Sequence, residues 1–201
     1  MENSIQSIGN EKRLKVCLLG NTSVGKTALT NKFIDEKYQV DNEKTVEEQY
    51  DKYIKILGDD CILQITDTGG LEDYQNTLSV WIKSSEGFLL VYSINDKDSF
   101  DGIKMRYEKI KKYKKKKKPY YVIIIGNKND LEKERQVDKE EVDKFCNENN
   151  LEHYEICSSN DEEISKIFME IAEKIYEIKY PPLEEESFKE TKNEFFCCRF
   201  C

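Results

Sequence analysis

Short apolar runs alternate with segments of helical periodicity along most of the chain. Three such runs cover residues 14–19, 88–92 and 121–125, and the first and third stop at a glycine. Because strands buried on both faces read as continuous apolar runs, this pattern favours a parallel sheet covered by helices. Residues 53–65 differ: two strand-like stretches around Gly58-Asp59-Asp60 predict an antiparallel hairpin at one edge of the sheet.

Helical periodicity fills the stretches between the runs. Apolar side chains recur at steps of three and four residues over 100–110 and 164–178, which predicts amphipathic helices there. Two late helices each carry a predicted capping box: Asp138 with Glu141, and Asn160 with Glu163. Strands that alternate with helices imply right-handed crossovers and a doubly wound α/β sheet.

Composition limits the classes of protein that remain. The 201 residues suit one domain with additions, which we place as a flexible N-terminus (1–12), a domain (13–180) and a disordered tail (181–201). The 32 basic and 40 acidic side chains give a net charge of -8, which argues against a generic nucleic-acid binder. No apolar run approaches the roughly 18 residues of a membrane span, and the first residues resemble neither a signal peptide nor a myristoylation site. Single cysteines in apolar stretches are typical of reduced intracellular thiols.

One motif after the first apolar run carries specific chemistry. Residues 20–27 read Gly-Asn-Thr-Ser-Val-Gly-Lys-Thr, which fits G-x-x-x-x-G-K-S/T directly between a strand and a helix. Glycines let successive backbone N–H groups point at phosphate oxygens, and the start of the helix adds its positive end. Lys26 would reach the β- and γ-phosphates, and the Thr27 hydroxyl would bind Mg²⁺. The alternative is a chance match, against which the flanking strand and helix both argue.

With three further motifs in order, the sequence resembles the Ras-type small GTPases. Residues 67–70 (Asp-Thr-Gly-Gly) match D-T-A/G-G, residues 127–130 (Asn-Lys-Asn-Asp) match N-K-x-D, and residues 157–160 (Cys-Ser-Ser-Asn) stand where the family has T-S-A-K. The resemblance covers about residues 13–179. It implies the α/β fold of a P-loop NTPase G domain: a mostly parallel six-stranded sheet with one antiparallel edge strand and helices on both faces.

The resemblance also assigns roles to individual residues. A carboxylate at Asp130 would accept from the guanine N1–H and 2-amino groups, which selects GTP and GDP over adenine nucleotides. Mg²⁺ would be bound by Thr27, by Thr45 and, through water, by Asp67. Tyr38 is a candidate to stack on the base, or equally an aromatic packed on the core. The implied GTP-binding set is Gly20, Asn21, Thr22, Ser23, Val24, Gly25, Lys26, Thr27, Ala28, Tyr38, Thr45, Asp67, Gly70, Asn127, Lys128, Asp130, Ser158 and Ser159.

The catalytic set departs from the family pattern. Lys26, Thr45 and the Gly70 amide match catalytic positions, but Leu71 stands where the family has the glutamine that orients the attacking water. Thr22 replaces a glycine close to the γ-phosphate. We therefore expect slow hydrolysis and a weak response to an arginine-finger activator. Asn42 and Asn160 also depart from the family, at the nucleotide lid and at the last base-binding loop.

Three other features have a functional and a plain interpretation. Thr45, Val46, Glu47, Glu48, Gln49 and Tyr50 resemble the Ras effector loop, against the alternative of a solvated acidic loop. Residues 109–118 contain eight lysines, which suit a solvated helix end, with contact to anionic lipid as the alternative. His153, the only histidine, is expected to be an ordinary surface residue.

The last residues predict a membrane anchor. Cys198-Arg199-Phe200-Cys201 has the C-a-a-X frame, with prenylation expected at Cys198 and palmitoylation at Cys197 as the second signal. The alternative is an unmodified cysteine cluster. Anchoring would place the protein on the cytoplasmic face of a membrane, with the plasma membrane expected.

The sequence therefore predicts a Ras-type GTP/GDP switch in signal transduction that hydrolyses GTP slowly. The alternative is a non-hydrolysing, constitutively GTP-loaded module that binds effectors, and a P-loop kinase is a distant third. Expected partners are effectors with Ras-binding-type domains, a guanine-nucleotide exchange factor, a GTPase-activating protein and a membrane, but no nucleic acid.

Overall fold

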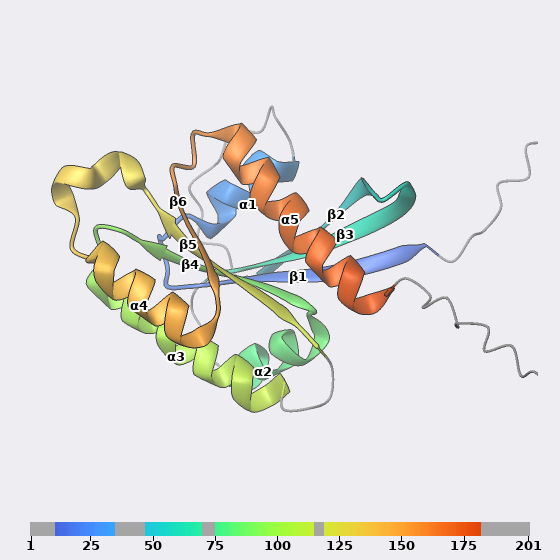
Figure 1. Cartoon of the computed structure of the whole chain (residues 1–201), viewed down its shortest axis with the longest axis horizontal. Helices are drawn as coiled ribbons and strands as arrows, with labels where there is room; N and C mark the ends of the chain where they lie inside the picture. The colour runs from blue at the N-terminus through green and yellow to red at the C-terminus, as the bar shows by residue number, and fades with distance from the viewer. Residues whose placement is uncertain (1–10, 35–46, 70–74, 115–118, 182–201) are drawn as a thin grey trace, which may run out of the picture.

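A six-stranded sheet organises the part of the chain that the structure describes. The computed structural model describes residues 11–34, 47–69, 75–114 and 119–181 (Figure 1). Within these ranges the strand order is β2-β3-β1-β4-β5-β6, with β2 antiparallel to β3 and the other pairs parallel. The strands are β1 (Lys12–Leu19), β2 (Glu47–Ile56), β3 (Asp59–Thr68), β4 (Gly87–Ser93), β5 (Tyr121–Asn127) and β6 (Glu152–Ile156). The predicted sheet, with one antiparallel edge strand, is confirmed.

Helices cover both faces of the sheet. They are α1 (Lys26–Ile34), α2 (Gln75–Ser84), α3 (Lys97–Lys114), α4 (Lys139–Asn149) and α5 (Asp161–Lys179), with a 3₁₀ helix η1 (Asn129–Glu134). Figure 1 shows α1 and α5 on one face and α2, α3 and α4 on the other. Successive side chains of a strand serve opposite faces: Val16 and Leu18 pack towards α1 and α5, while Cys17 and Leu19 belong to the core beneath α2, α3 and α4. All seven residues of β4 are buried, which explains the continuous apolar run.

The edge hairpin is longer than predicted and turns earlier. Strand β2 begins at Glu47, and β3 already begins at Asp59. The two residues between the strands, Leu57 and Gly58, both have positive φ (51° and 92°). A two-residue loop with positive φ at both positions matches the right-handed twist of the flanking strands. Asp59, which the sequence placed in the turn, therefore lies in the strand.

Only part of each predicted capping box is present. Asp138 caps α4 by accepting from the backbone N–H of Glu140, and Asn160 caps α5 by accepting from the N–H of Glu163 at 3.3 Å. Glu141, the predicted partner of Asp138, instead uses its carboxylate to accept from Lys104 at 2.7 Å and from Lys97. Two lysines on α3 thus hold a side chain that the box would have turned back to the helix start.

The last turns of α3 and α5 converge at the start of β4, away from the predicted nucleotide loops. Lys114 is buried and donates to the Ser85 carbonyl, while Lys179 binds the Glu86 carboxylate at 2.6 Å. Lys114 is therefore wrongly predicted as part of a solvated face. Lys115 to Lys118 lie outside the described residues.

The domain begins one residue earlier than predicted. Lys12, placed in the flexible N-terminus, is part of β1 and binds Asp59 at 2.5 Å and the Tyr176 hydroxyl at 2.7 Å. Residues 1–10 and the tail from 182 onward lie outside the described part. Among the helices that are described, none has the length and apolarity that crossing a membrane requires.

Candidate nucleotide-binding site

The predicted phosphate loop follows the carboxyl end of β1, in the middle of the sheet. Ser23 and Gly25 have φ angles of 65° and 99°, so the backbone coils tightly before α1 begins at Lys26. At Gly25 a Cβ atom would lie 2.2 Å from Nδ2 of Asn127. Only glycine fits there, because the positive φ and the close approach of Asn127 both exclude a side chain.

Lys26 lies inside this loop. Its ammonium group donates to the carbonyl oxygens of Gly20 at 2.8 Å and Asn21 at 2.9 Å, and the residue is only 4% exposed. These acceptors are neutral, and a phosphate oxygen in the loop would be the stronger partner for an ammonium group. The loop therefore surrounds a buried cation with acceptors that an anion can replace.

The predicted metal ligands lie together between α1 and β3. The Thr27 hydroxyl donates to Oδ2 of Asp67 at 2.5 Å, and Asp67 is fully buried. Within the described part of the chain, its Oδ1 has no hydrogen-bond partner. Burial raises the pKa of Asp67 to about 6, although the Thr27 hydrogen bond and Lys26 oppose the rise. A buried carboxylate beside a hydroxyl is the oxygen set that Mg²⁺ prefers, so these residues fit the metal.

The predicted base loop is fastened to the phosphate loop. Asn127, at the end of β5, donates to the Val24 carbonyl at 2.8 Å, and Lys128 donates to the Ser23 carbonyl at 2.8 Å. The Asn127 Oδ1 is buried and has no partner among the described residues. Asp130 follows in η1 with an exposed side chain. The loops for phosphate and base, about a hundred residues apart in the sequence, thus share direct contacts.

The second predicted base-contacting segment, residues 157–160, follows β6, the strand next to β5. Ile156 pairs with Asn127 across the two strands, so the loops that follow them leave the sheet side by side. Ser158 is half-buried and Ser159 exposed, and the Ser159 hydroxyl lies 3.0 Å from the Cys157 sulfur. Asn160 is committed to the cap of α5.

Three residues of α3 that the sequence did not single out, Asp98, Gly102 and Arg106, lie against Asn21 of the phosphate loop. Arg106 donates to Oδ1 of Asn21 at 2.8 Å, and Asn21 donates to the Asp98 carbonyl at 3.3 Å. Gly102 permits this contact, because a Cβ there would lie 2.5 Å from the Asn21 Oδ1. A charged residue among the apolar positions Ile103, Tyr107 and Ile110 was the available signal for Arg106.

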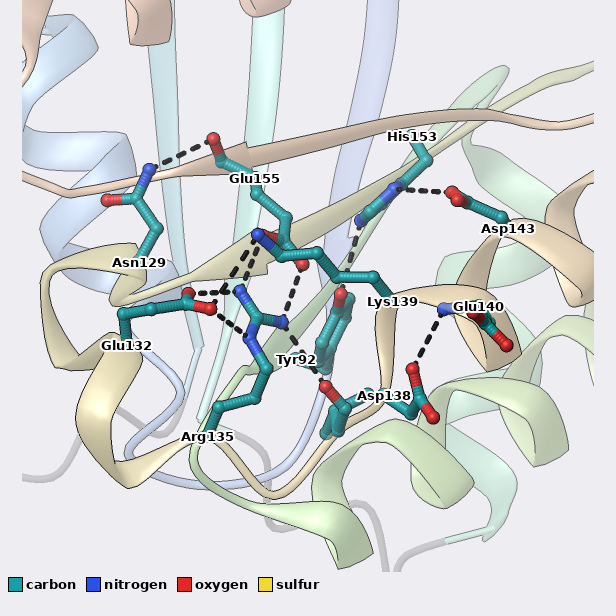
Figure 2. Close-up of polar contacts among 11 residues, drawn as sticks. Tyr92, Asn129, Glu132, Arg135, Asp138, Lys139, Glu140, Asp143, His153 and Glu155 are labelled. Carbon is teal, nitrogen blue, oxygen red and sulfur yellow. Dashed lines mark hydrogen bonds and ion pairs between the residues drawn. The ribbon is translucent and has the colours of Figure 1, made fainter.

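The structure places His153 differently from the prediction. Its side chain is only 14% exposed, its Nε2 lies 3.1 Å from the Tyr92 hydroxyl, and its Nδ1 lies 4.0 Å from the Asp143 carboxylate (Figure 2). Burial lowers the pKa of His153. The expectation of an ordinary surface residue is wrong, because the His153 side chain is largely shielded from solvent. Tyr92 on β4 supplies the polar partner that it needs there.

Several predicted site residues lie outside the described part of the chain. These are Tyr38, Asn42, Thr45, Val46, Gly70 and Leu71, the side chain of Glu47, and the tail cysteines Cys197 and Cys198. Of the effector segment, Glu48 and Gln49 are exposed on β2, the edge strand, and the Tyr50 hydroxyl donates to the Glu48 carboxylate. At the phosphate loop, Thr22 is exposed and its hydroxyl lies 3.4 Å from the Gly69 carbonyl.

Comparisons with known proteins agree with this geometry. The sequence model of the Ras family matches residues 15–177. Ras-like protein rasU of Dictyostelium discoideum is 35% identical over 164 residues, which cover 82% of this chain and 76% of that protein. Ras-related protein Ral-B of Rattus norvegicus is 33% identical over 161 residues, which cover 80% and 78%. With a matching family model, these relatives and linked loops for phosphate and base, the chain belongs to the Ras family of small GTPases.

Proposed function

We propose that this GTPase is a slow guanine-nucleotide switch whose Leu71 and Thr22 limit the hydrolysis step. The observation that carries the proposal is the single site formed by the phosphate loop, the Thr27–Asp67 pair and Asn127. Lys26 would neutralise the β- and γ-phosphates, and Asp130 would accept from the guanine base. Thr27 and Asp67 would hold Mg²⁺, which would supply positive charge to neutralise the phosphates.

Two side chains support slow hydrolysis. Leu71 is apolar and has no group that orients an attacking water. Thr22 brings a β-branched side chain next to Gly69, one residue before Gly70, whose amide is the proposed γ-phosphate ligand. A side chain in this gap leaves less room for water or for an arginine supplied by an activator. The intact metal and base residues favour a cycling enzyme over a non-hydrolysing module.

The hydrolysis proposal is tested by single-turnover measurements on protein loaded with GTP. We expect Leu71→Gln to increase the rate constant by about tenfold, because the amide orients water, while Leu71→Ala, which shortens the side chain without adding a polar group, leaves it unchanged. Equal rates for wild type and Leu71→Gln would refute the role of Leu71. Preference for GDP over ADP in a competition assay tests the base-reading role separately.

We further propose a signalling role at a membrane, with effectors bound along β2 through Glu48 and Gln49. An exposed edge strand offers backbone groups for pairing with a partner strand. Lipids on Cys198 and Cys197 would supply the two signals that stable anchoring needs. Replacement of both cysteines by serine is expected to move the protein from the membrane to the soluble fraction. Unchanged partitioning, or no lipid found by mass spectrometry, contradicts the anchor. The effector surface is tested separately with Glu48→Lys. If this variant still binds an effector in a GTP-dependent way, the proposed binding surface along β2 is wrong.

A further inference from the structure

We propose that Arg135 is a positioning residue that holds the two base-contacting loops in place and thereby sets how strongly the protein discriminates guanine from hypoxanthine. This inference rests on the proposed role of Asp130 and of the segment 157–160 in binding the base. It concerns residues outside both segments. Arg135 follows η1, and its partners lie on η1, on β6 and in the loop before α4 (Figure 2).

Every N–H of the Arg135 guanidinium has an acceptor. Nε and Nη2 donate to the two carboxylate oxygens of Glu132 at 3.0 and 2.6 Å. Nη1 and Nη2 donate to the two oxygens of Glu155 at 2.8 and 2.7 Å. Nη1 also donates to the Val137 carbonyl at 3.2 Å. Arginine has five such donors in a fixed plane, and here all five define its position.

The pair with Glu155 is the buried half of this arrangement. The side chains of Arg135 and Glu155 are 14% and 16% exposed, whereas that of Glu132 is 56% exposed. Lys139 adds a second positive charge 3.7 Å from each of the two carboxylates. Two cations therefore balance two anions, and the pair shielded from solvent contributes most to the rigidity of the cluster.

Glu155 connects this cluster to both base-contacting segments. Its carbonyl oxygen accepts from the Asn129 side chain at 3.1 Å, and Asn129 is the residue before Asp130. Cys157, the first residue of the other segment, is two positions further along the chain. Arg135 therefore holds Glu155, which lies just before the segment 157–160 and whose carbonyl accepts from Asn129 of the other segment.

The η1 segment needs such a contact because hydrophobic packing does not hold it. None of its six residues is buried. The chain is fixed again only after it, where the backbone N–H groups of Gln136 and Val137 donate to the Ile94 carbonyl at 2.9 and 3.0 Å. Between Asn127 and Gln136, Lys128 fastens the segment that presents Asp130 to the phosphate loop, and Asn129 and Arg135 fasten it to β6.

The chemistry of the base turns this positioning into discrimination. In the proposed site the Asp130 carboxylate accepts from guanine N1–H and from the 2-amino group, and hypoxanthine lacks the 2-amino group. A carboxylate held in place gains from both donors, whereas a displaced one loses the two-point geometry and with it the advantage of guanine. Loss of the Arg135 contacts should thus weaken GDP more than inosine diphosphate.

The test measures dissociation rate constants and affinities for GDP and inosine diphosphate on the full chain. Arg135→Lys keeps the charge but loses the planar donor set. We expect it to release GDP about tenfold faster and to lower the GDP-to-inosine-diphosphate affinity ratio about fivefold. The matched control is Glu141→Gln, which breaks an ion-pair cluster with Lys97 and Lys104, two residues of α3 rather than of a base-contacting segment. It should leave both quantities within about twofold of wild type.

A second variant keeps the test decisive if Arg135→Lys folds poorly. Glu132→Gln changes only the exposed partner, so the fold should persist while the affinity ratio falls by a smaller factor. An unchanged ratio in the folded variants overturns the proposal, and so does an equal loss for both nucleotides, which indicates a general loss of stability. A wild-type protein that does not prefer GDP to ADP refutes the proposed function instead.

Discussion

The two halves of the proposed nucleotide site, one for phosphate and one for the base, are held by different kinds of contact. In the phosphate half, the Lys26 ammonium group donates to the neutral backbone carbonyls of Gly20 and Asn21. In the base half, Arg135 is paired with two full carboxylates. A charged acceptor binds a cation more strongly than a neutral carbonyl does. The Lys26 ammonium group can therefore exchange its backbone carbonyls for a phosphate oxygen. The base half has no such exchange available and acts as a fixed frame.

Two side chains of the base loop join the halves: Lys128 donates to the Ser23 carbonyl, and Asn127 contacts Val24 and Gly25. Asn127 belongs to the base loop by sequence, but its Nδ2 donates to Val24 in the phosphate loop and lies against Gly25. Asn127 thus lies at the boundary between the phosphate half and the base half, and variants in the two halves should differ in their effect on nucleotide binding. A change in the phosphate half should affect affinity for all nucleotides, and a change in the base half should affect the choice among them.

The largest effect is expected for Lys26→Met. It removes the buried cation of the phosphate half, so affinity for GDP and for inosine diphosphate should fall alike, by at least about 3 kcal/mol or about a hundredfold. Titration with fluorescent nucleotides measures this loss. The control is Lys32→Met on the same helix, whose ammonium pairs with Asp161 at 3.1 Å and whose side chain is substantially exposed. A selective loss of GDP would contradict the division into two halves.

A smaller but broader effect is expected for Asn127→Ala at the boundary. The Val24 carbonyl loses its donor, at a cost of about 2 kcal/mol, so nucleotide release should be about thirtyfold faster. Because both halves depend on this amide, overall affinity and base preference should fall together. Nucleotide release with GDP and inosine diphosphate separates the outcomes, and a change in only one of the two quantities would place Asn127 in one half alone.

The smallest effect concerns pH and the base half. Burial lowers the pKa of His153 in the folded protein, so the unfolded chain takes up a proton first as the pH falls. The stability of the neutral folded form is therefore present above the unfolded pKa of about 6.5 and is lost as the pH drops through the folded value. Urea midpoints should fall more between pH 7.5 and 5.5 for wild type than for His153→Phe. Parallel changes would remove His153 as the cause.

Local spacing explains why much of the site was predictable. Gly25, Lys26 and Thr27 are fixed by a motif of eight residues, and Asn127 and Asp130 by one of four. Arg106 and Arg135 were missed because Asn21, the partner of Arg106, and Glu155, the buried partner of Arg135, lie 85 and 20 residues away, and no local pattern encodes such contacts. The wrong expectation for His153 has the same origin, since Tyr92 is 61 residues distant. Periodicity predicted the sheet and helices, but it did not distinguish the buried Lys114 from its solvated neighbours.

The convergence of α3 and α5 at Ser85 and Glu86 has a practical consequence. It brings the last described residues of the domain to the end of the strands opposite the nucleotide loops, beside the start of β1 (Figure 1). A fluorophore or surface tether attached next to Pro181 would leave the loops for phosphate and base facing away from the support. Binding measured on an immobilised sample should therefore match binding in free solution.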